Sequence, residues 1–235
     1  MRVVSVAVLV LLATACNKKI GWIKGKGPTE TEIRPVTGFN KIALDMDAEV
    51  IYEQDSVYYV EVSAQENILE VLRTEVSAGE LKIDTKRWVR KSNPITLIIH
   101  SPNIYAFTIS GSGNIRSNAP INTSWMDLKI SGSGNLSLAS LLTQDLETTI
   151  SGSGDVTVEN GSTVNEKMKI SGSGDIFARY LTAQSSAATI SGSGNITVQV
   201  IQSLDATISG SGSIMYAGNP AVNAHISGSG SVTHI

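Results

Sequence analysis

The 235-residue chain has little of what usually stabilises a small secreted protein or builds a catalytic centre. Its 1 cysteine excludes a disulfide within the chain, so the fold must rest on burial and hydrogen bonding. A net charge of −3 argues against a nucleic-acid partner. A phosphate-binding loop, a metal-binding cysteine pair and a dinucleotide fingerprint are all missing. We therefore expect no cofactor.

The apolar run at the amino terminus is too short to cross a bilayer as a mature helix. It covers residues 3–14 after the basic Arg2 and is typical of a secretory signal. Its end, Ala13-Thr14-Ala15-Cys16, resembles a bacterial lipoprotein signal, which implies cleavage before Cys16 and a diacylglycerol thioether on the Cys16 sulfur. The alternative is an ordinary cleaved signal with an incidental cysteine. We expect a signal peptide over residues 1–15 and a lipid anchor in the bacterial cell envelope, facing the periplasm or the cell exterior.

Residues 16–35 follow as the lipidated cysteine and a basic, flexible tether. Lysine and arginine outnumber the acidic residues here, and the segment contains Gly25, Gly27 and Pro28. The basic excess either favours anionic lipid headgroups next to the anchor or belongs to a solvated spacer.

One five-residue phrase, Ile-Ser-Gly-Ser-Gly, occurs seven times in the second half of the chain. A period near 20 residues indicates a stacked repeat. A flexible glycine-serine linker is excluded because each phrase lies inside a strict apolar alternation. The copies begin at Ile109, Ile130, Ile150, Ile170, Ile190, Ile208 and Ile226, with spacings of 21, 20, 20, 20, 18 and 18 residues.

The alternation around each phrase predicts β-strands with one buried face. Leu146, Thr148 and Ile150 share one parity with Val156 and Val158 across the phrase, and mostly polar residues occupy the other parity. The parity continues through the glycines, so the phrase predicts a bend in the strand path. Inward glycines let the backbone curve sharply or approach the opposite wall. These structural glycines are Gly111, Gly113, Gly132, Gly134, Gly152, Gly154, Gly172, Gly174, Gly192, Gly194, Gly210, Gly212, Gly228 and Gly230.

The remaining residues of each repeat return the chain and carry a third apolar row. Its members are Ile121, Leu141, Val164, Leu181 and Ile201. We predict an all-β fold in which residues 109–235 form a β-solenoid of about seven coils, with three apolar rows filling the interior.

Residues 36–108 predict less regular structure. Strands are expected at residues 42–45, 50–53, 57–62, 81–85 and 95–100, and a short helix lies within Gln65–Arg73. We expect this segment to form irregular first coils that cap the amino-terminal end of the solenoid.

Over residues 36–235 the chain resembles the bacterial head GIN domain family, labelled auto-transporter adhesin heads. The resemblance rests on the opening Gly38-Phe39-Asn40-Lys41-Ile42, the Pro102-Asn103 step, and the repeated Gly-Ser-Gly-(Asn/Asp)-(Ile/Val) phrases. It implies a right-handed β-helix on secreted or lipid-anchored proteins, with no established activity.

The serines of the phrases are the first candidates for chemistry. Stacking places them in two outward files with about 4.8 Å between coils. A nucleophilic serine needs a positioned base, and His100, His225 and His234 match no triad arrangement. We expect a hydrogen-bonded hydroxyl ladder on a tight bend.

The position after each phrase brings two like charges together. Asp155 and Asp175 are neighbours on adjacent coils, where stacked carboxylates repel. The repulsion is relieved by a raised pKa on one carboxyl, by a weak cation site for an ion such as Ca²⁺, or by solvent with nearby Lys167 or Lys169. We favour the third and keep the weak calcium site as the alternative.

A binding or structural role is favoured over catalysis. A carbohydrate-active β-helix needs clustered carboxylates with a base, or calcium with a basic residue, whereas the outward face here is mostly Ser, Thr and Asn. We predict a non-enzymatic, adhesin-like, lipid-anchored module with a glycan or an envelope protein as partner. The alternatives are a carbohydrate-active enzyme, a polysaccharide-binding protein, and passive adsorption through the hydroxyl array. The candidate ligand surface comprises Ser151, Ser153, Ser171, Ser173, Ser191, Ser193, Phe177 and Tyr180.

The last coil provides a possible contact with another chain. Val222, Ala224, Ile226 and Val232 are expected on an end face with few shielding atoms. Exposed strand edges pair readily with other chains. We expect this end to dock on a partner or to form a weak end-to-end homodimer.

Overall fold

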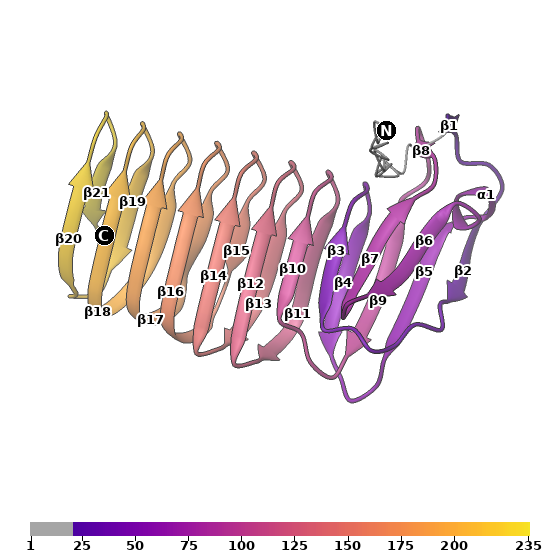
Figure 1. Cartoon of the computed structure of the whole chain (residues 1–235), viewed down its shortest axis with the longest axis horizontal. Helices are drawn as coiled ribbons and strands as arrows, with labels where there is room; N and C mark the ends of the chain where they lie inside the picture. Colours follow the sequence, from indigo (N-terminus) through magenta and orange to yellow (C-terminus); the bar gives the residue numbers. More distant parts are fainter. Residues whose placement is uncertain (1–20) are drawn as a thin grey trace, which may run out of the picture.

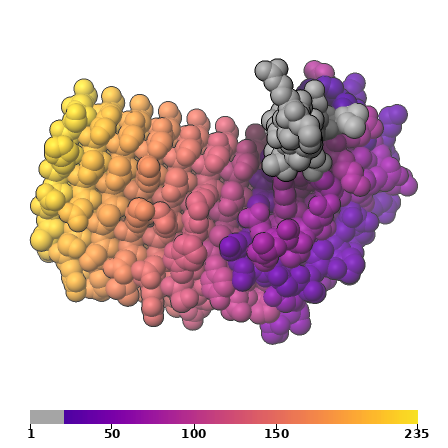
Figure 2. Space-filling view, in the orientation of Figure 1, coloured from indigo at the N-terminus to yellow at the C-terminus, as the bar shows by residue number. Residues whose placement is uncertain are grey.

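The structure of the protein, a computed structural model, describes residues 21–235, so the predicted signal peptide and Cys16 lie outside the described residues. Parallel strands stack coil upon coil in a β-solenoid of about 6 turns, which confirms the predicted fold class. The glycine bends lie along one edge of the stack (Figure 1). The coils form a regular series of ridges on the surface (Figure 2). Among residues 21–235, no helix is both long enough and apolar enough to cross a membrane.

Each coil consists of two strands joined by a glycine bend. β14 (Asp145–Ile150) leads into a bend, β15 (Val156–Val158) follows it, and β16 (Gly161–Ile170) begins the next coil. Equivalent strands pair in parallel and in register, so that Ile150 lies between Ile130 and Ile170 of the neighbouring coils. This register aligns the phrases and turns one sequence position into a file along the stack.

The strands form two long faces. The face that precedes the bends contains, in stacking order, β7 (Glu80–Thr85), β3 (Lys41–Leu44), β10 (Ala106–Ile109), β12 (Trp125–Ile130), β14, β16, the later halves of β17 (Ile176–Ile190) and β18 (Ile196–Ile208), and β20 (Ala221–Ile226). The face that follows the bends contains β9 (Thr96–Ser101), β4 (Glu49–Gln54), β11 (Asn114–Asn122), β13 (Leu136–Leu142), β15, the early halves of β17 and β18, β19 (Ser213–Ala217) and β21 (Ser231–His234).

The interior is filled by the apolar parity of the strands. Ile150 and Ile170 before the bends, and Val156 and Ile176 after them, are at most 1% exposed. Burying one such side chain contributes about 1.5–3 kcal/mol, and the contribution recurs in every coil. The predicted inward parity is therefore the one that forms the core.

The predicted third apolar row is wrong at two of its members. Val164 and Ile201 are 48% and 49% exposed, while Thr163 and Val200 lie inside at 4% and 0%. Gly161 takes the position between Leu141 and Leu181 in the stack, so the residues that follow it are shifted in phase. The coil that contains Ile201 is shorter, which brings Val200 opposite Ala183.

The amino-terminal part of the stack is not built in chain order. The coil of β3 and β4 lies between the coil of β7 and β9 and that of β10 and β11. Antiparallel strands close this end, since β5 (Tyr59–Gln65) pairs with β9 and β6 (Leu72–Ser77) pairs with β7. The helix within Gln65–Arg73 is only α1 (Glu66–Leu69), because β6 begins at Leu72.

The predicted flexible tether is wrong for most of residues 22–33. β1 (Trp22–Ile23) pairs with β8 (Trp88–Val89), and β2 (Thr29–Ile33) pairs in antiparallel fashion with β5. Ile23 packs against the core and Arg34 binds the carbonyl oxygen of Leu69 at 2.9 Å. Partners distant in sequence therefore order a segment whose local composition favours flexibility.

Candidate functional site

At the bends, the backbones of successive coils lie very close together. A Cβ atom built on Gly152 would lie 1.9 Å from the carbonyl oxygen of Gly132, and one on Gly154 would lie 1.9 Å from that of Gly134. These glycines are required by the neighbouring coil, not by the opposite wall of the solenoid. The first pair, Gly111 and Gly113, meets the backbone of Met46 and Ala48 instead. At the other bend glycines, a Cβ atom would likewise lie 1.8–2.3 Å from the carbonyl oxygen of the glycine in the preceding coil. These are Gly132, Gly134, Gly172, Gly174, Gly192, Gly194, Gly210, Gly212, Gly228 and Gly230.

The bend serines use their backbone and not their hydroxyl groups. The N–H of Ser151 donates to the carbonyl of Ile130 at 2.8 Å, and that of Ser153 donates to Gly132 at 3.1 Å. In the described chain the hydroxyl groups of the six candidate serines make no hydrogen bond, so the expected hydroxyl ladder does not form. The exposed hydroxyl array comprises Ser151, Ser153, Ser171, Ser173, Ser191 and Ser193.

A side-chain ladder forms one position further along, after each phrase. The backbone N–H of Asp155 donates to Oδ1 of Asn135 at 3.0 Å, and that of Asp175 donates to Oδ1 of Asp155 at 2.8 Å. The N–H of Asn195 continues the ladder to Oδ1 of Asp175 at 2.6 Å. Either an amide or a carboxylate oxygen accepts this bond, which explains why both Asn and Asp occur at this position.

The ladder already uses one oxygen of each candidate cation ligand. Asp175 also accepts a bond from the side-chain amide of Asn195, at 3.1 Å. Within residues 21–235 no group of three or more acidic, histidine or cysteine side chains is arranged to hold a metal ion. Of the two lysines expected to relieve the repulsion, Lys167 is engaged elsewhere, because it pairs with Glu147 at 2.9 Å.

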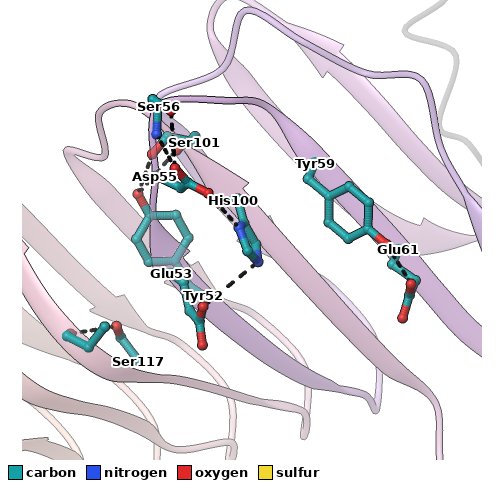
Figure 3. A network of polar contacts seen from close by, with 10 residues as sticks. Tyr52, Glu53, Asp55, Ser56, Tyr59, Glu61, His100, Ser101 and Ser117 are labelled. Atoms are coloured by element: carbon teal, nitrogen blue, oxygen red, sulfur yellow. Dashed lines mark hydrogen bonds and ion pairs between the residues drawn. The ribbon is translucent and has the colours of Figure 1, made fainter.

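His100 belongs to a polar network on the outer side of the first coils (Figure 3). Its Nδ1 lies 3.4 Å from Asp55 and its Nε2 lies 3.9 Å from Glu53. The pKa of the Asp55 carboxyl is lowered, mainly by the hydrogen bond from the backbone N–H of Ser56. The contact with His100 and the Ser56 hydroxyl group lower it further. Both ring nitrogens therefore face carboxylates, and within residues 21–235 no hydroxyl nucleophile is placed on either of them.

Ser101, the neighbour of His100, faces the interior. It is fully buried and lies 3.1 Å from the hydroxyl of Tyr52, while its own hydroxyl donates to the carbonyl of Asn103 at 3.0 Å. Burial raises the pKa of Tyr52 to about 12. This pair closes a core turn and is shielded from any substrate.

One buried acid was not found by the sequence reasoning. Glu166 is 3% exposed and stands in an interior position between Leu146 and Ser186. Neither of its carboxylate oxygens has a hydrogen-bond partner in the described chain. Burial raises the pKa of Glu166 to about 8. The alternation Glu166-Lys167-Met168 was the signal, because it gives Glu166 the parity of the buried Met168.

The groove with exposed aromatic side chains lies where the coils become shorter. Two consecutive pairs in the ladder are Ala178 with Val198 and Thr182 with Gln199, so three residues of β17 have no partner on the next coil. These residues are Arg179, Tyr180 and Leu181. The phrase spacing falls from 20 to 18 residues at this coil, so the longer coil overhangs the shorter one. We call this overhang the coil step. The change in spacing is therefore the sequence signal for the groove.

Phe177 and Tyr180 stand over this overhang. Their side chains are 42% and 65% exposed, and Phe177 lies between Thr157 and Thr197 of the adjacent coils. Arg179 forms no ion pair within residues 21–235. The groove has a volume of about 490 Å³ and is lined by Thr157, Val158, Glu159, Phe177, Arg179, Tyr180 and Thr197.

The structure thus divides the predicted ligand surface. Phe177 and Tyr180 line one groove, whereas none of the six bend serines is part of its lining. Besides the aromatic rings, the lining contains two threonine hydroxyl groups, a carboxylate and a guanidinium. Such a combination can bury an apolar face of a ligand and bind polar groups at its rim.

The chain matches a known family over most of its length. Residues 38–220 match the family described as "Putative auto-transporter adhesin, head GIN domain". No curated protein matches the chain. A crystal structure of a "putative adhesin" from Bacteroides fragilis is 27% identical, with a TM-score of 0.87 over 91% of this chain and 100% of that one.

Two Parabacteroides structures show the same fold. A "putative lipid binding protein" from Parabacteroides distasonis is 28% identical, with a TM-score of 0.75 over 91% of this chain and 99% of that one. A "putative adhesin" from Parabacteroides merdae has 24% identity and a TM-score of 0.75, again over 91% and 99%. These similarities agree with the solenoid derived from the repeat.

Proposed function

The chain belongs to the head GIN domain family, and from this premise we propose that it is a non-enzymatic, lipid-anchored adhesin-like module that binds a glycan at the cell envelope. The adhesin names of the family and of its structural relatives support a role at the envelope or cell surface. The groove over the coil step is the observation that carries the choice of ligand.

A glycan fits the chemistry of this groove. The exposed faces of Phe177 and Tyr180 are suited to cover the C–H face of a sugar ring, which is apolar. Thr157, Arg179 and Glu159 supply donors and acceptors for the hydroxyl groups around the ring. Because the coils stack in parallel, Ser137 and Thr157 precede Phe177 in the same file, so a longer glycan can extend along these hydroxyl groups.

Binding is favoured over turnover in this groove. Hydrolysis of a glycosidic bond commonly uses two carboxyl groups on either side of the bond. Glu159 is the one carboxylate in the lining of the groove. We therefore propose that the groove lined by Phe177 and Tyr180 binds a glycan and does not cleave it.

The lipid anchor is the second part of the proposal, and Cys16 carries it. As the single cysteine, directly after a lipoprotein-like signal, it is the expected acceptor of the diacylglycerol group. Cys16→Ser should move the protein from the membrane fraction to the soluble fraction, while Asn17→Ser should leave it in the membrane. An unmodified amino terminus in the mass spectrum of the mature wild-type protein would contradict the anchor.

A glycan array tests the binding function directly. Wild-type protein should bind a defined set of glycans, with or without calcium, and the Phe177→Ala/Tyr180→Ala double variant should lose that set. Leu142→Ala provides the matched control, because Leu142 is 44% exposed but lies outside the groove. Equal binding by the double variant and the control would assign the ligand to another surface.

A further inference from the structure

Two tryptophans stand next to each other at the amino-terminal end of the solenoid. We define the tryptophan ribbon as residues 21–27, which contain β1, and residues 86–93, which contain β8. Trp22 pairs with Trp88 across the two strands, with ring centroids 5.9 Å apart. The rings are 60% and 50% exposed, while Ile23 and Val89 pack on the core. The ribbon therefore has one face on the core and presents two indole rings on the other.

The ribbon is also the most basic part of the described chain. Its two segments hold 6 of the 18 lysine and arginine residues of the protein and neither aspartate nor glutamate. Arg90 covers the Trp22 ring at 5.4 Å, and Arg87 donates to the Trp22 carbonyl at 2.8 Å. The six are Lys24, Lys26, Lys86, Arg87, Arg90 and Lys91.

The ribbon's cations have no acidic partners, unlike most basic residues elsewhere. Within residues 21–235 none of the six forms an ion pair, and residues 1–20 contain no acid. In the rest of the described chain, six basic residues pair with a carboxylate: Arg34, Arg73, Lys82, Arg116, Lys129 and Lys167. The positive charge of the ribbon is therefore not neutralised within the fold.

The acids near the ribbon do not cancel its charge. Asp45 and Asp47 border a hollow of about 870 Å³ together with Trp88 and Lys91. Glu66 stands beside Gly27, with Oε2 at 3.6 Å from the position of a Cβ atom there. Glu70 precedes Val71, whose carbonyl accepts the backbone N–H of Lys86. Six basic residues against these four carboxylates leave the surface positive.

We propose that the tryptophan ribbon docks on the anionic surface of the membrane that holds the anchor. Tryptophan favours the membrane–water interface, and each basic residue near an anionic surface strengthens binding by about fivefold. Gly21 follows Cys16 by five residues, which span at most about 18 Å. A lipid on Cys16 therefore keeps the ribbon within reach of the headgroups. This inference rests on the anchor proposed above.

Docking through the ribbon determines which end of the molecule meets the membrane. β1 and β8 lie at the opposite end of the solenoid from β20 and β21 (Figure 1). The ribbon therefore brings the amino-terminal end to the headgroups and leaves the end with β20 and β21 farthest from the docking surface.

Depth-dependent quenching of tryptophan fluorescence by brominated lipids tests the docking. The lipidated full chain is reconstituted into vesicles of phosphatidylcholine with or without phosphatidylglycerol. A Trp125→Phe variant reports the ribbon alone, and a Trp22→Phe/Trp88→Phe variant reports Trp125 on β12 as the internal control. Lys24→Glu/Lys26→Glu tests the charge, with the exposed Lys169→Glu as its matched control.

Docking predicts strong quenching of the ribbon tryptophans in anionic vesicles and little quenching of Trp125. The ribbon signal should be lost in neutral vesicles and in Lys24→Glu/Lys26→Glu, and should be retained in Lys169→Glu. Chains that float with the vesicles but show no ribbon quenching, or equal quenching of Trp125, overturn the proposal. Chains that do not float and carry an unmodified Cys16 contradict the anchor alone. Anionic vesicles added to those chains must then still quench the ribbon, and a failure to do so overturns the docking as well.

Discussion

The backbone N–H of Asp175 donates a hydrogen bond to Oδ1 of Asp155 in the preceding coil, at 2.8 Å. Two residues expected to repel each other are thus linked through the backbone of one and the side chain of the other. The ladder needs an oxygen at each step and does not need a charge. The repeat can therefore exchange Asn and Asp from coil to coil.

Removing the acceptor should cost more than removing the charge. Asp175→Ala deprives the N–H and the side-chain amide of Asn195 of their partner, at about 1–3 kcal/mol of unfolding free energy. Asp175→Asn keeps the acceptor and should stay within about 0.5 kcal/mol of wild type. Urea unfolding of the two variants measures the difference, and equal losses would show that the ladder does not stabilise the bend.

The same ladder allows a test of the weak calcium site. Ca²⁺ takes 6–8 oxygen ligands, and Asp155 and Asp175 each already accept a hydrogen bond through Oδ1. We expect millimolar calcium to leave the melting temperature unchanged in wild type and in Asp155→Asn. A calcium-dependent rise that disappears in Asp155→Asn would establish the site.

A single methyl group at a bend should be more damaging than the loss of an outward hydroxyl. Gly152→Ala places a Cβ atom 1.9 Å from the Gly132 carbonyl oxygen, so two coils must move apart, at roughly 1–3 kcal/mol or more. Ser153→Ala removes an exposed hydroxyl and should cost less than about 0.5 kcal/mol. Comparable losses in chemical denaturation would mean that the bends tolerate a wider spacing of coils.

Stability should fall as the buried Glu166 ionises. Its pKa is about 8 in the folded protein and 4.5 ordinarily, so the folded state holds the proton more tightly. The stabilisation is complete below pH 4.5 and is lost as the pH rises to about 8, by an amount on the order of 5 kcal/mol. Glu166→Gln cannot ionise, so its unfolding free energy should exceed that of wild type increasingly between pH 5 and pH 8.

Unfolding of the Glu166 variant across this pH range is compared with Glu147→Gln. Glu147 is half-exposed and pairs with Lys167 on the next coil, so its replacement should not change the slope of stability with pH. A parallel course of the wild-type and Glu166→Gln curves would show that Glu166 has an ordinary pKa.

Association through the last coil should depend on its apolar face. β20 pairs only with β18 among the described residues, and Val222 and Ile226 are 39% and 43% exposed. We expect weak end-to-end self-association that Val222→Lys abolishes and Val164→Lys, in the middle of the stack, leaves intact. Sedimentation of a strict monomer at high protein concentration would refute this contact.

The repeat made the fold predictable, whereas the places where the chain departs from the repeat could not be predicted. The spacing of Ile150 and Ile170 determines the register, and the parity around them determines which side chains are buried. Val164 and Ile201 were misplaced because turns of unequal length change the phase locally. The ordering of Trp22 depends on Trp88, a partner distant in sequence that no periodicity reveals.

The candidate site was predicted in part for the same reason. Phe177 and Tyr180 stand out by composition in a region of small polar residues. Their common groove arises from the shorter coil beyond them, and the fall in phrase spacing encodes that step. Glu166 was missed because an acidic residue at inward parity contradicts the expectation that buried residues are apolar.

Calorimetric titration with the glycan selected on the array tests the central claim, that the groove over the coil step is the ligand site. The Phe177→Ala/Tyr180→Ala variant should raise the Kd at least about tenfold, since exposed aromatic anchors dominate such contacts. Leu142→Ala should leave the Kd unchanged. An unchanged Kd in the double variant, with its unfolding transition intact, would contradict the account.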